Sequence, residues 1–432
     1  MTPWGFAPSA GEQSHTERVS WATTKGDLSP WTTMTLDKHL KGCEDIHFLT
    51  ASQRHKIPSQ ITKPTQQQTG TASKLTFLPT MPAGYTFGIE LEYLVPFLYT
   101  GDPDPEPNDR RTIDRAVQGE NAFCDDYGIV IDNAIYDRVR STLRFVGLPA
   151  AKMPDLPVGA LPSQWDVVVD ESLVETDEME AMYGEGNFIP VELNSPVLLV
   201  ERASFRSIRL AVDALVSKHR LFITDTCGFH VHVGRGKEGF PLPALKNIAA
   251  FLWVFEPQLG TLHPKDRHLN GYGSPMRERG NIKRLLPDVR QGVREIYAAS
   301  TARKLVHLIH WTDQYEKLEN DEVFIRNMAY NFVNIVHKEG KKTIEFRQAA
   351  STTDSLDVKM WAEICTGIVA ACAEKAVPEW KEFLLDAAAK EERKAPDVMK
   401  VEELLRMIGL SDQATWAQQR SKKLWPATCS IQ

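Results

Sequence analysis

Residues 87–94 read Phe-Gly-Ile-Glu-Leu-Glu-Tyr-Leu, and polar and apolar side chains alternate along this stretch. Successive side chains of a β-strand point to opposite faces of its sheet. Glu90 and Glu92 therefore share one face, while Ile89 and Leu91 share the other. The stretch predicts a strand with an apolar back and two carboxylates on its front.

Three further segments show the same alternation. They are Cys-Gly-Phe-His-Val-His-Val at 227–233, Thr-Ile-Glu-Phe-Arg-Gln at 343–348 and Val-Glu-Leu at 191–193. The polar side chains that they would add to the front of the sheet are His230, His232, Glu345, Arg347 and Glu192. An isolated acidic or histidine pair on a strand is usually a solvated face. Here, however, carboxylates, imidazoles and one guanidinium replace the Thr, Lys and Ser of ordinary solvated strands.

This set of residue types indicates a metal site. Carboxylates gathered on one face repel one another unless cations neutralise them. Mg²⁺ or Mn²⁺ with oxygen ligands and one imidazole fits the set, and the arginine would face an anion such as phosphate that the metals also hold. The chain has no GxxxxGK[ST], kinase, GxSxG or HExxH motif. The face therefore predicts phosphoryl transfer assisted by metal ions rather than by a P-loop.

The order of strand-like and helix-like segments predicts an α+β fold, in which helices pack on the apolar face of a largely antiparallel sheet. The expected strands are 85–95, 165–169, 189–193, 228–233, 331–337 and 342–348. The expected helices are 204–219, 244–258, 301–311, 356–375, 379–389 and 401–407. The last two strands should form a hairpin with Gly340 in the turn, and helix 356–375 should pack behind the sheet.

Composition limits the possible classes of protein. With 432 residues and 42% hydrophobic residues, the chain is typical of a globular enzyme. Its longest apolar runs, 247–255 and 361–373, fall short of the roughly 18 residues that span a bilayer, and no secretory signal begins it, so we expect a cytoplasmic protein without membrane contact. A net charge of −7 argues against nucleic acid as a partner. The six cysteines form no CxxC pair and are expected to be reduced.

The chain divides into three expected parts. Residues 1–80, rich in Ser, Thr, Gln and Pro, predict a largely disordered extension whose tryptophans would contact a partner or the domain surface. Residues 81–376 would form the catalytic domain, and 377–432 a helical segment packed on it. Polar insertions at 101–120 and 171–187 are expected to be surface loops or lids.

Five motifs, in order along the chain, carry a resemblance to a known family. They are Gly-Ile-Glu-Leu-Glu at 88–92, Trp-x-Val-x-x-Asp-x-Ser at 165–172, Val-Glu-Leu-x-Ser-Pro at 191–196, Cys-Gly-x-His-Val-His-Val-Gly at 227–234 and Thr-Ile-Glu-Phe-Arg at 343–347. In these motifs the chain resembles the putative amidoligase family, whose members are carboxylate–amine ligases with the fold of glutamine synthetase and glutamate–cysteine ligase. The resemblance implies that ATP phosphorylates a carboxylate, and that an amine then attacks the acyl phosphate to form an amide.

The resemblance also implies a role for each site residue. Metal ions, Mg²⁺ or Mn²⁺, would be held by Glu90, Glu92, Glu192, His230 and Glu345. Arg347 would stabilise the phosphoryl group in transfer, and His230 could contact a nucleotide phosphate instead of a metal. His232, on the same face of its strand, would hold the ligands in place without binding the metal itself. Asp170 would orient or deprotonate the amine, unless it is a turn or helix-cap aspartate.

Two further segments are candidates for supporting roles. Ser195, before Pro196, is expected to shape the exit of its strand, and it has no base that would make it a nucleophile. The glycine-rich basic stretch 271–284 would clamp the ATP phosphates or the substrate carboxylate, or would be an ordinary solvated loop. Its candidate side chains are Arg277, Arg279 and Lys283. The substrates are expected to be carboxylates and amines of small molecules, peptides or proteins.

Two other functions compete with the ligase. A zinc hydrolase would use His230 and His232 with a carboxylate, although the excess of glutamates is unlike a zinc site. A non-catalytic interaction protein would keep the fold and use residues 1–80 to bind a partner. Metal analysis and an assay of ADP release distinguish the ligase from the zinc hydrolase.

Overall fold

A computed structural model of the protein describes residues 84–117, 128–152, 163–269, 271–285, 288–311, 326–337 and 341–426. The predicted extension over 1–80 and the turn at Gly340 lie outside the described residues. No helix in the described ranges is long and apolar enough to cross a membrane.

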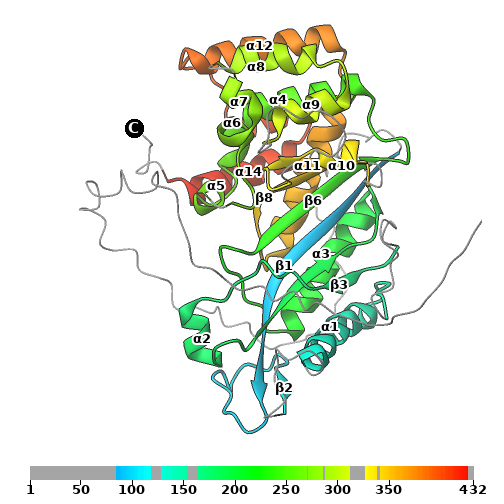
Figure 1. Ribbon diagram of the computed structural model, residues 1–432, viewed down its shortest axis with the longest axis vertical. Coiled ribbons are helices and arrows are strands. Elements are labelled where there is room, and N and C mark those ends of the chain that lie inside the picture. The colour runs from blue at the N-terminus through cyan, green and yellow to red at the C-terminus, as the bar shows by residue number, and fades with distance from the viewer. Residues whose placement is uncertain are drawn as a thin grey trace, which may run out of the picture. The chain divides into compact units, whose positions relative to one another are not determined.

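An antiparallel sheet is the centre of the fold, and its longest strand is β1, Tyr85–Tyr99 (Figure 1). The other strands are β2 (Asp114–Ala116), β3 (Asp166–Val168), β4 (Phe188–Asn194), β5 (Leu198–Leu199), β6 (Gly228–Arg235), β7 (Tyr330–Asn331) and β8 (Thr343–Ala350). They follow the order β3-β4-β1-β6-β8-β7, with β5 paired antiparallel to β1 and β2 paired parallel to it. Together with the helices, this sheet confirms the predicted α+β class.

Helices surround the sheet, and α11 packs on its apolar side (Figure 1). They are α1 (Gly128–Phe145), α2 (Asp177–Tyr183), α3 (Arg202–Lys218), α4 (Leu242–Gly260), α5 (Asp266–Leu269), α6 (Met276–Arg279), α7 (Asn281–Leu285), α8 (Val289–Ala298), α9 (Ala302–Ile309), α10 (Val333–Val336), α11 (Ser355–Ala373), α12 (Val377–Glu392), α13 (Val401–Met407) and α14 (Ser411–Leu424). Helices α3 and α11 contact each other, and α11 contacts β1 and β6.

The apolar face of the sheet supplies the main core. Ile89, Val231 and Phe346, one from each of three neighbouring strands, are at most 1% exposed. The ring of Phe346 meets that of Trp361 on α11 edge to face, with the centroids 6.2 Å apart. The predicted packing of this helix behind the sheet is confirmed, and each fully buried aliphatic or aromatic side chain contributes about 1.5–3 kcal/mol.

The predicted strand over 331–337 is wrong. Strand β7 ends at Asn331, and the helical turn α10 follows it. The Asn331 Oδ1 atom accepts a hydrogen bond from the Val333 backbone N–H at 2.9 Å, and His310 Nε2 accepts one from Phe332 N–H at 2.9 Å. Side chains that bind the backbone in this way compete with the sheet ladder and end the strand. Only the short pairing of β7 with β8 remains of the expected hairpin.

One buried arginine binds the described part of the polar insertion that begins at residue 101. Arg220 is 1% exposed and donates to both carboxylate oxygens of Asp104, at 2.6 and 2.7 Å. It also donates to the carbonyls of Glu106 and Asp109. The described part of this insertion is therefore an ordered loop held by charge-assisted hydrogen bonds.

Candidate active site

The register of the sheet brings the polar residues of four segments onto one face. Glu92 lies directly opposite Glu192 across β1 and β4. Glu90 lies opposite His230 across β1 and β6, and His232 lies opposite Glu345 across β6 and β8. Directly opposed residues of antiparallel strands have neighbouring side chains. Alternation within each strand and this register between strands therefore build the face together.

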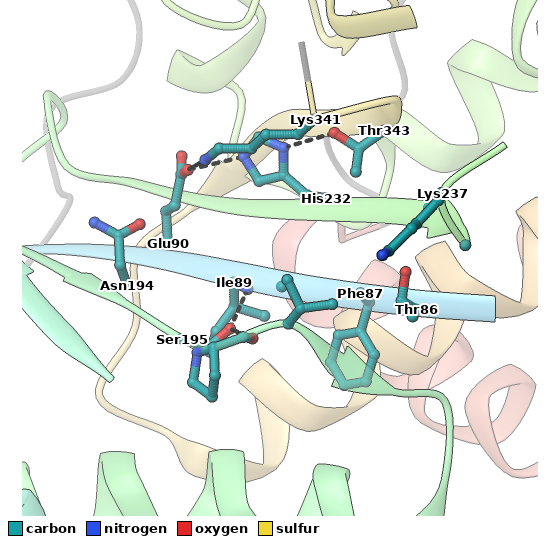
Figure 2. A pocket seen from close by; sticks show the side chains of 15 residues that line it. Thr86, Phe87, Ile89, Glu90, Asn194, Ser195, His232, Lys237, Lys341 and Thr343 are labelled. Carbon is teal, nitrogen blue, oxygen red and sulfur yellow. Dashed lines mark hydrogen bonds and ion pairs between the residues drawn. The ribbon is translucent and has the colours of Figure 1, made fainter. Parts of the chain in front are cut away.

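Glu90, His230 and Glu345 form a first cluster, in which one ligand atom from each lies within 4.8 Å of the others. His230 Nδ1 lies 3.3 Å from Glu90 Oε2 and 3.8 Å from Glu345 Oε1. His232 joins this cluster, with Nε2 only 2.9 Å from Glu90 Oε1 (Figure 2). Two carboxylates and two imidazoles thus converge from β1, β6 and β8.

A second cluster consists of carboxylates alone. Glu92, Asp170 and Glu192 each offer an oxygen within 4.8 Å of the other two. The Gly228 backbone N–H donates to Glu92 Oε2 at 2.5 Å, and Asn194 Nδ2 donates to Glu192 Oε1 at 2.7 Å. Asp170 also accepts from the Ser172 N–H at 2.9 Å, so it shapes its own turn while its carboxylate joins the cluster.

Arg347 borders the first cluster. Its guanidinium donates to Glu345 Oε1 and lies 3.4 Å from His230 Nδ1, while Nε donates to the Tyr272 carbonyl at 3.3 Å. Asn331 Nδ2 donates to the other oxygen of Glu345 at 2.7 Å. Glu345 is therefore held from both sides, and Arg347 is oriented toward the imidazole of His230.

The two clusters differ in their electrostatics. Burial tends to raise the pKa of Glu90 and of Glu345, but the facing imidazoles, and for Glu345 also Arg347, lower both values below the ordinary range. Burial raises the pKa of Glu92, and burial followed by the charge of Glu90 raises the pKa of Glu192 to about 8. The imidazoles and Arg347 thus offset part of the charge of Glu90 and Glu345. In the second cluster His230 lies 3.5 Å from Glu92, and the buried carboxyl of Glu192 favours a bound proton or a cation.

A cavity of about 220 Å³ adjoins the first cluster (Figure 2). Glu90 and His232 belong to its lining. Small residues and apolar side chains line much of the rest, and these include Thr86, Gly88, Gly234, Thr343, Pro196 and Val197. Lys237 and Lys341 also line it, and Lys341 Nζ lies 3.6 Å from Glu90 Oε1. The cavity therefore combines a glycine-containing wall with two lysine ammonium groups, and that of Lys341 lies beside Glu90.

The predicted basic loop does not bring its side chains to this face. Arg277 forms an ion pair of 2.7 Å with Glu391 and stacks over the ring of Trp253. Arg279 and Lys283 are exposed, and none of the three lines the cavity. The backbone of the same loop does reach the site, because the Tyr272 carbonyl accepts a hydrogen bond from Arg347.

Ser195 has the position that its expected role requires. Its Oγ accepts a hydrogen bond from the Ile89 N–H at 2.8 Å and donates to the Pro196 carbonyl at 2.9 Å. The hydroxyl thus ties the end of β4 to β1 beside Gly88, whose added Cβ would lie 3.5 Å from it. This geometry holds the strand exit in place.

Sequence reasoning missed several residues around the site. Asn194 could have been found, because it lies two residues after Glu192 and period two places both on one face. Lys237 and Lys341 lie at the two strand ends beside the cavity, where periodicity carries no information. Arg267 lies on the short helix α5, and nothing in the sequence indicates that this helix faces β8.

Comparison with known families decides the identity of the domain. The model of the family described as "Putative amidoligase enzyme" matches residues 83–369. The chain belongs to this family. The matched amidoligase region runs from β1 into α11 and contains both clusters, the cavity and Arg347. The resemblance predicted from the five motifs is thereby confirmed. Among curated proteins, none matches the chain.

Proposed function

We propose that this amidoligase is an ATP-dependent carboxylate–amine ligase that uses Mg²⁺ or Mn²⁺. The observation that carries the proposal is the pair of adjacent clusters, one of which contains carboxylates only. Arg347 borders the other cluster, and the cavity with its two lysines opens beside it. Family membership supports ligation as the class of reaction.

The side chains fit divalent cations. Three carboxylates within 4.8 Å, two of them with raised pKa, form an oxygen-ligand set of the kind that Mg²⁺ and Mn²⁺ prefer. In our proposal Glu92, Asp170 and Glu192 hold one cation. Glu90, His230 and Glu345 hold a second, with His232 supporting Glu90 from the side. The cations would neutralise phosphate charge and polarise the transferred group.

The cavity beside the first cluster is our candidate site for the nucleotide. Its lining is largely of small and apolar residues, among them Gly88, Gly234 and Val197, which suits the base of a nucleotide. Lys341, at the end that adjoins Glu90, and Lys237, near Thr86, would contact phosphate oxygens (Figure 2). This assignment gives the phosphate-binding role to these two lysines, whereas the sequence pointed to the loop at 271–284.

The reaction would proceed in two steps on this face. An oxygen of the substrate carboxylate attacks the γ-phosphorus of ATP. The bond between this phosphorus and the β–γ bridging oxygen breaks, and ADP leaves with that oxygen. Arg347, fixed by Glu345 and Tyr272, would stabilise the charge on the phosphoryl group in transfer. The amine then attacks the acyl carbon, phosphate leaves, and the proton lost by the amine passes to a carboxylate. Asp170, at the edge of the second cluster, is our candidate for orienting the amine.

The test is a screen of carboxylate and amine pairs with ATP and Mg²⁺ that records phosphate release and product mass together. We expect at least one pair to give an amide with one phosphate for each bond formed. Glu90→Gln and Arg347→Ala should each abolish ATP consumption while the protein stays folded. Bound zinc at unit stoichiometry without nucleotide binding would favour the hydrolase, and collapse of both variants would show that these residues are structural.

A further inference from the structure

Arg267 is a buried arginine at the edge of the site. It lies on α5 and is 2% exposed. Its guanidinium donates to the Asp225 carbonyl at 3.1 Å and to the Arg347 carbonyl at 3.3 Å, while its Nε has no hydrogen-bond partner among the described residues. Keeping a guanidinium out of water costs several kcal/mol, so this placement calls for a compensating interaction.

The carbonyl that Arg267 binds belongs to an irregular part of the sheet. Phe229 pairs with Ala349, but Val231 pairs with Phe346, so His230 faces both Arg347 and its neighbour on β8. Bulges of this kind re-aim side chains and leave a backbone group outside the regular ladder. Arg267 supplies a partner for the Arg347 carbonyl at this point, and its other bond reaches Asp225, just before β6. One guanidinium therefore links β8 at its register shift to the loop that leads into β6.

Other contacts from the same segment hold Arg347 in place. The Tyr272 carbonyl accepts from its Nε, and Gly273 packs so closely on its carbonyl that an added Cβ would lie 3.1 Å from that oxygen. The Arg347 N–H donates to the Ala329 carbonyl at 2.9 Å. Backbone and side chain of Arg347 are thus both fixed, and Arg267 provides the charged part of this clamp.

The charge of Arg267 also lies close to the carboxylates. A Cβ added to Gly228 would lie 3.2 Å from a guanidinium nitrogen of Arg267 and 3.1 Å from Glu92 Oε2. Both groups pack against the α-carbon of Gly228, which carries no side chain. The carboxylate of Glu92 thereby compensates part of the cost of burying the guanidinium, and the guanidinium offsets part of the charge of the second cluster.

We infer that Arg267 is a positioning residue for Arg347: it clamps the β8 bulge, so that the Arg347 guanidinium stays beside Glu345 and His230. This inference rests on the proposed function for its catalytic consequence, but the clamp itself is a structural claim. It assigns a role to a residue outside the strand motifs. A lysine at 267 would keep the charge but not the planar fork that reaches two carbonyls.

Hydrogen exchange tests the clamp without any assay of activity. In Arg267→Gln, amide exchange in a peptide covering β8 should become about tenfold faster, because the bulge loses its cross-strand link. Arg420→Gln is the matched control, since Arg420 also donates to a carbonyl, that of Leu262, but on α14. It should leave exchange in β8 unchanged. Unchanged exchange of β8 in a folded Arg267→Gln protein would overturn the inference, and Arg267→Lys serves if the glutamine variant does not fold.

A double-mutant cycle tests the catalytic consequence. Arg267→Gln should lower kcat about tenfold with little change in the KM for ATP, whereas in an Arg347→Lys background it should cost less than about twofold. Equal losses in both backgrounds would show that Arg267 does not act through Arg347. Faster exchange of β8 in Arg267→Gln, combined with a wild-type protein that consumes no ATP with any substrate pair, would contradict the ligase and leave the clamp standing.

Discussion

Glu92 and Glu192 face each other directly across β1 and β4, Glu92 buried and Glu192 half-buried, and the imidazole of His230 lies 3.5 Å from Glu92 Oε1. Like charges directly opposite each other on neighbouring strands are destabilising. Burial raises the pKa of both groups, and for Glu192 the value reaches about 8. A pair of this kind is tolerated when a bound proton or cation compensates the repulsion.

Glu192→Gln should remove one of two divalent-cation sites. Titration of the wild-type protein with Mn²⁺ should give two sites, and the variant should give one, because the second cluster loses a ligand and a charge. At a Mn²⁺ concentration a hundred times the Kd, binding at one site stabilises the folded protein by about 2.7 kcal/mol. Thermal unfolding should show that the variant has lost this contribution from the second cluster. Glu185→Gln, which changes an exposed acidic residue, is the control. Two intact sites in Glu192→Gln would contradict the assignment.

The lysines beside the cavity should govern nucleotide affinity. Lys341→Gln and Lys237→Gln should each raise the KM for ATP about tenfold, because each removes one charged contact to phosphate, and Lys237→Gln should leave Mn²⁺ binding unchanged. Lys283→Gln tests the loop that the sequence favoured, and we expect it to behave as the wild type. If Lys283→Gln weakens ATP binding and the two cavity lysines have no effect, the nucleotide lies elsewhere.

The polar face was predictable because its information is local. Glu90 with Glu92, and Glu345 with Arg347, are each two residues apart on one strand, and alternation alone places each pair together. The register between strands is not local, yet the apolar residues in between specify it, since a slip by one residue would bury the carboxylates on the core side. Pattern within strands thus predicted most of the face.

The remaining parts of the site depend on contacts that no periodicity encodes. The prediction of a strand at 331–337 was wrong because Asn331 and His310 accept hydrogen bonds from backbone N–H groups at its start. Arg277 was predicted to contact ATP phosphates because it is a basic residue in a glycine-rich loop. Its ion-pair partner Glu391, however, lies on a helix far along the chain. Lys341 and Arg267 reach the site through tertiary packing alone.

Gly228 should tolerate no side chain. A Cβ there would lie 2.7 Å from His230 Nε2 and 3.1 Å from Glu92 Oε2, so Gly228→Ala must displace groups of both clusters. We expect a loss of about 1–3 kcal/mol in the free energy of unfolding, and a fall in turnover larger than that loss explains. Gly271→Ala, with nothing within 4 Å of its added Cβ, is the matched control. Wild-type turnover in Gly228→Ala would show that the clusters are less rigid than the structure indicates.

Glu256 predicts a pH dependence of stability that is separate from the proposed metal ligands. Its buried carboxylate accepts hydrogen bonds from the backbone N–H groups of Met276 and Arg277, at 2.7 and 2.6 Å. Burial raises its pKa to about 7 in spite of these bonds. The bonds fix the start of α6, just after the segment that contacts Arg347.

The sign of the effect follows from the two protonation states. Between the unfolded value of about 4.5 and the folded value of about 7, the native protein binds this proton more tightly than the unfolded chain. Stability from this group therefore falls as the pH rises through that range, by about 3 kcal/mol in all. Glu256→Gln has no proton to lose, so the difference between its free energy of unfolding and that of the wild type should increase from pH 4.5 to 7 and then level off. Denaturant unfolding at several pH values measures this, and parallel curves for the two proteins would show that Glu256 titrates normally.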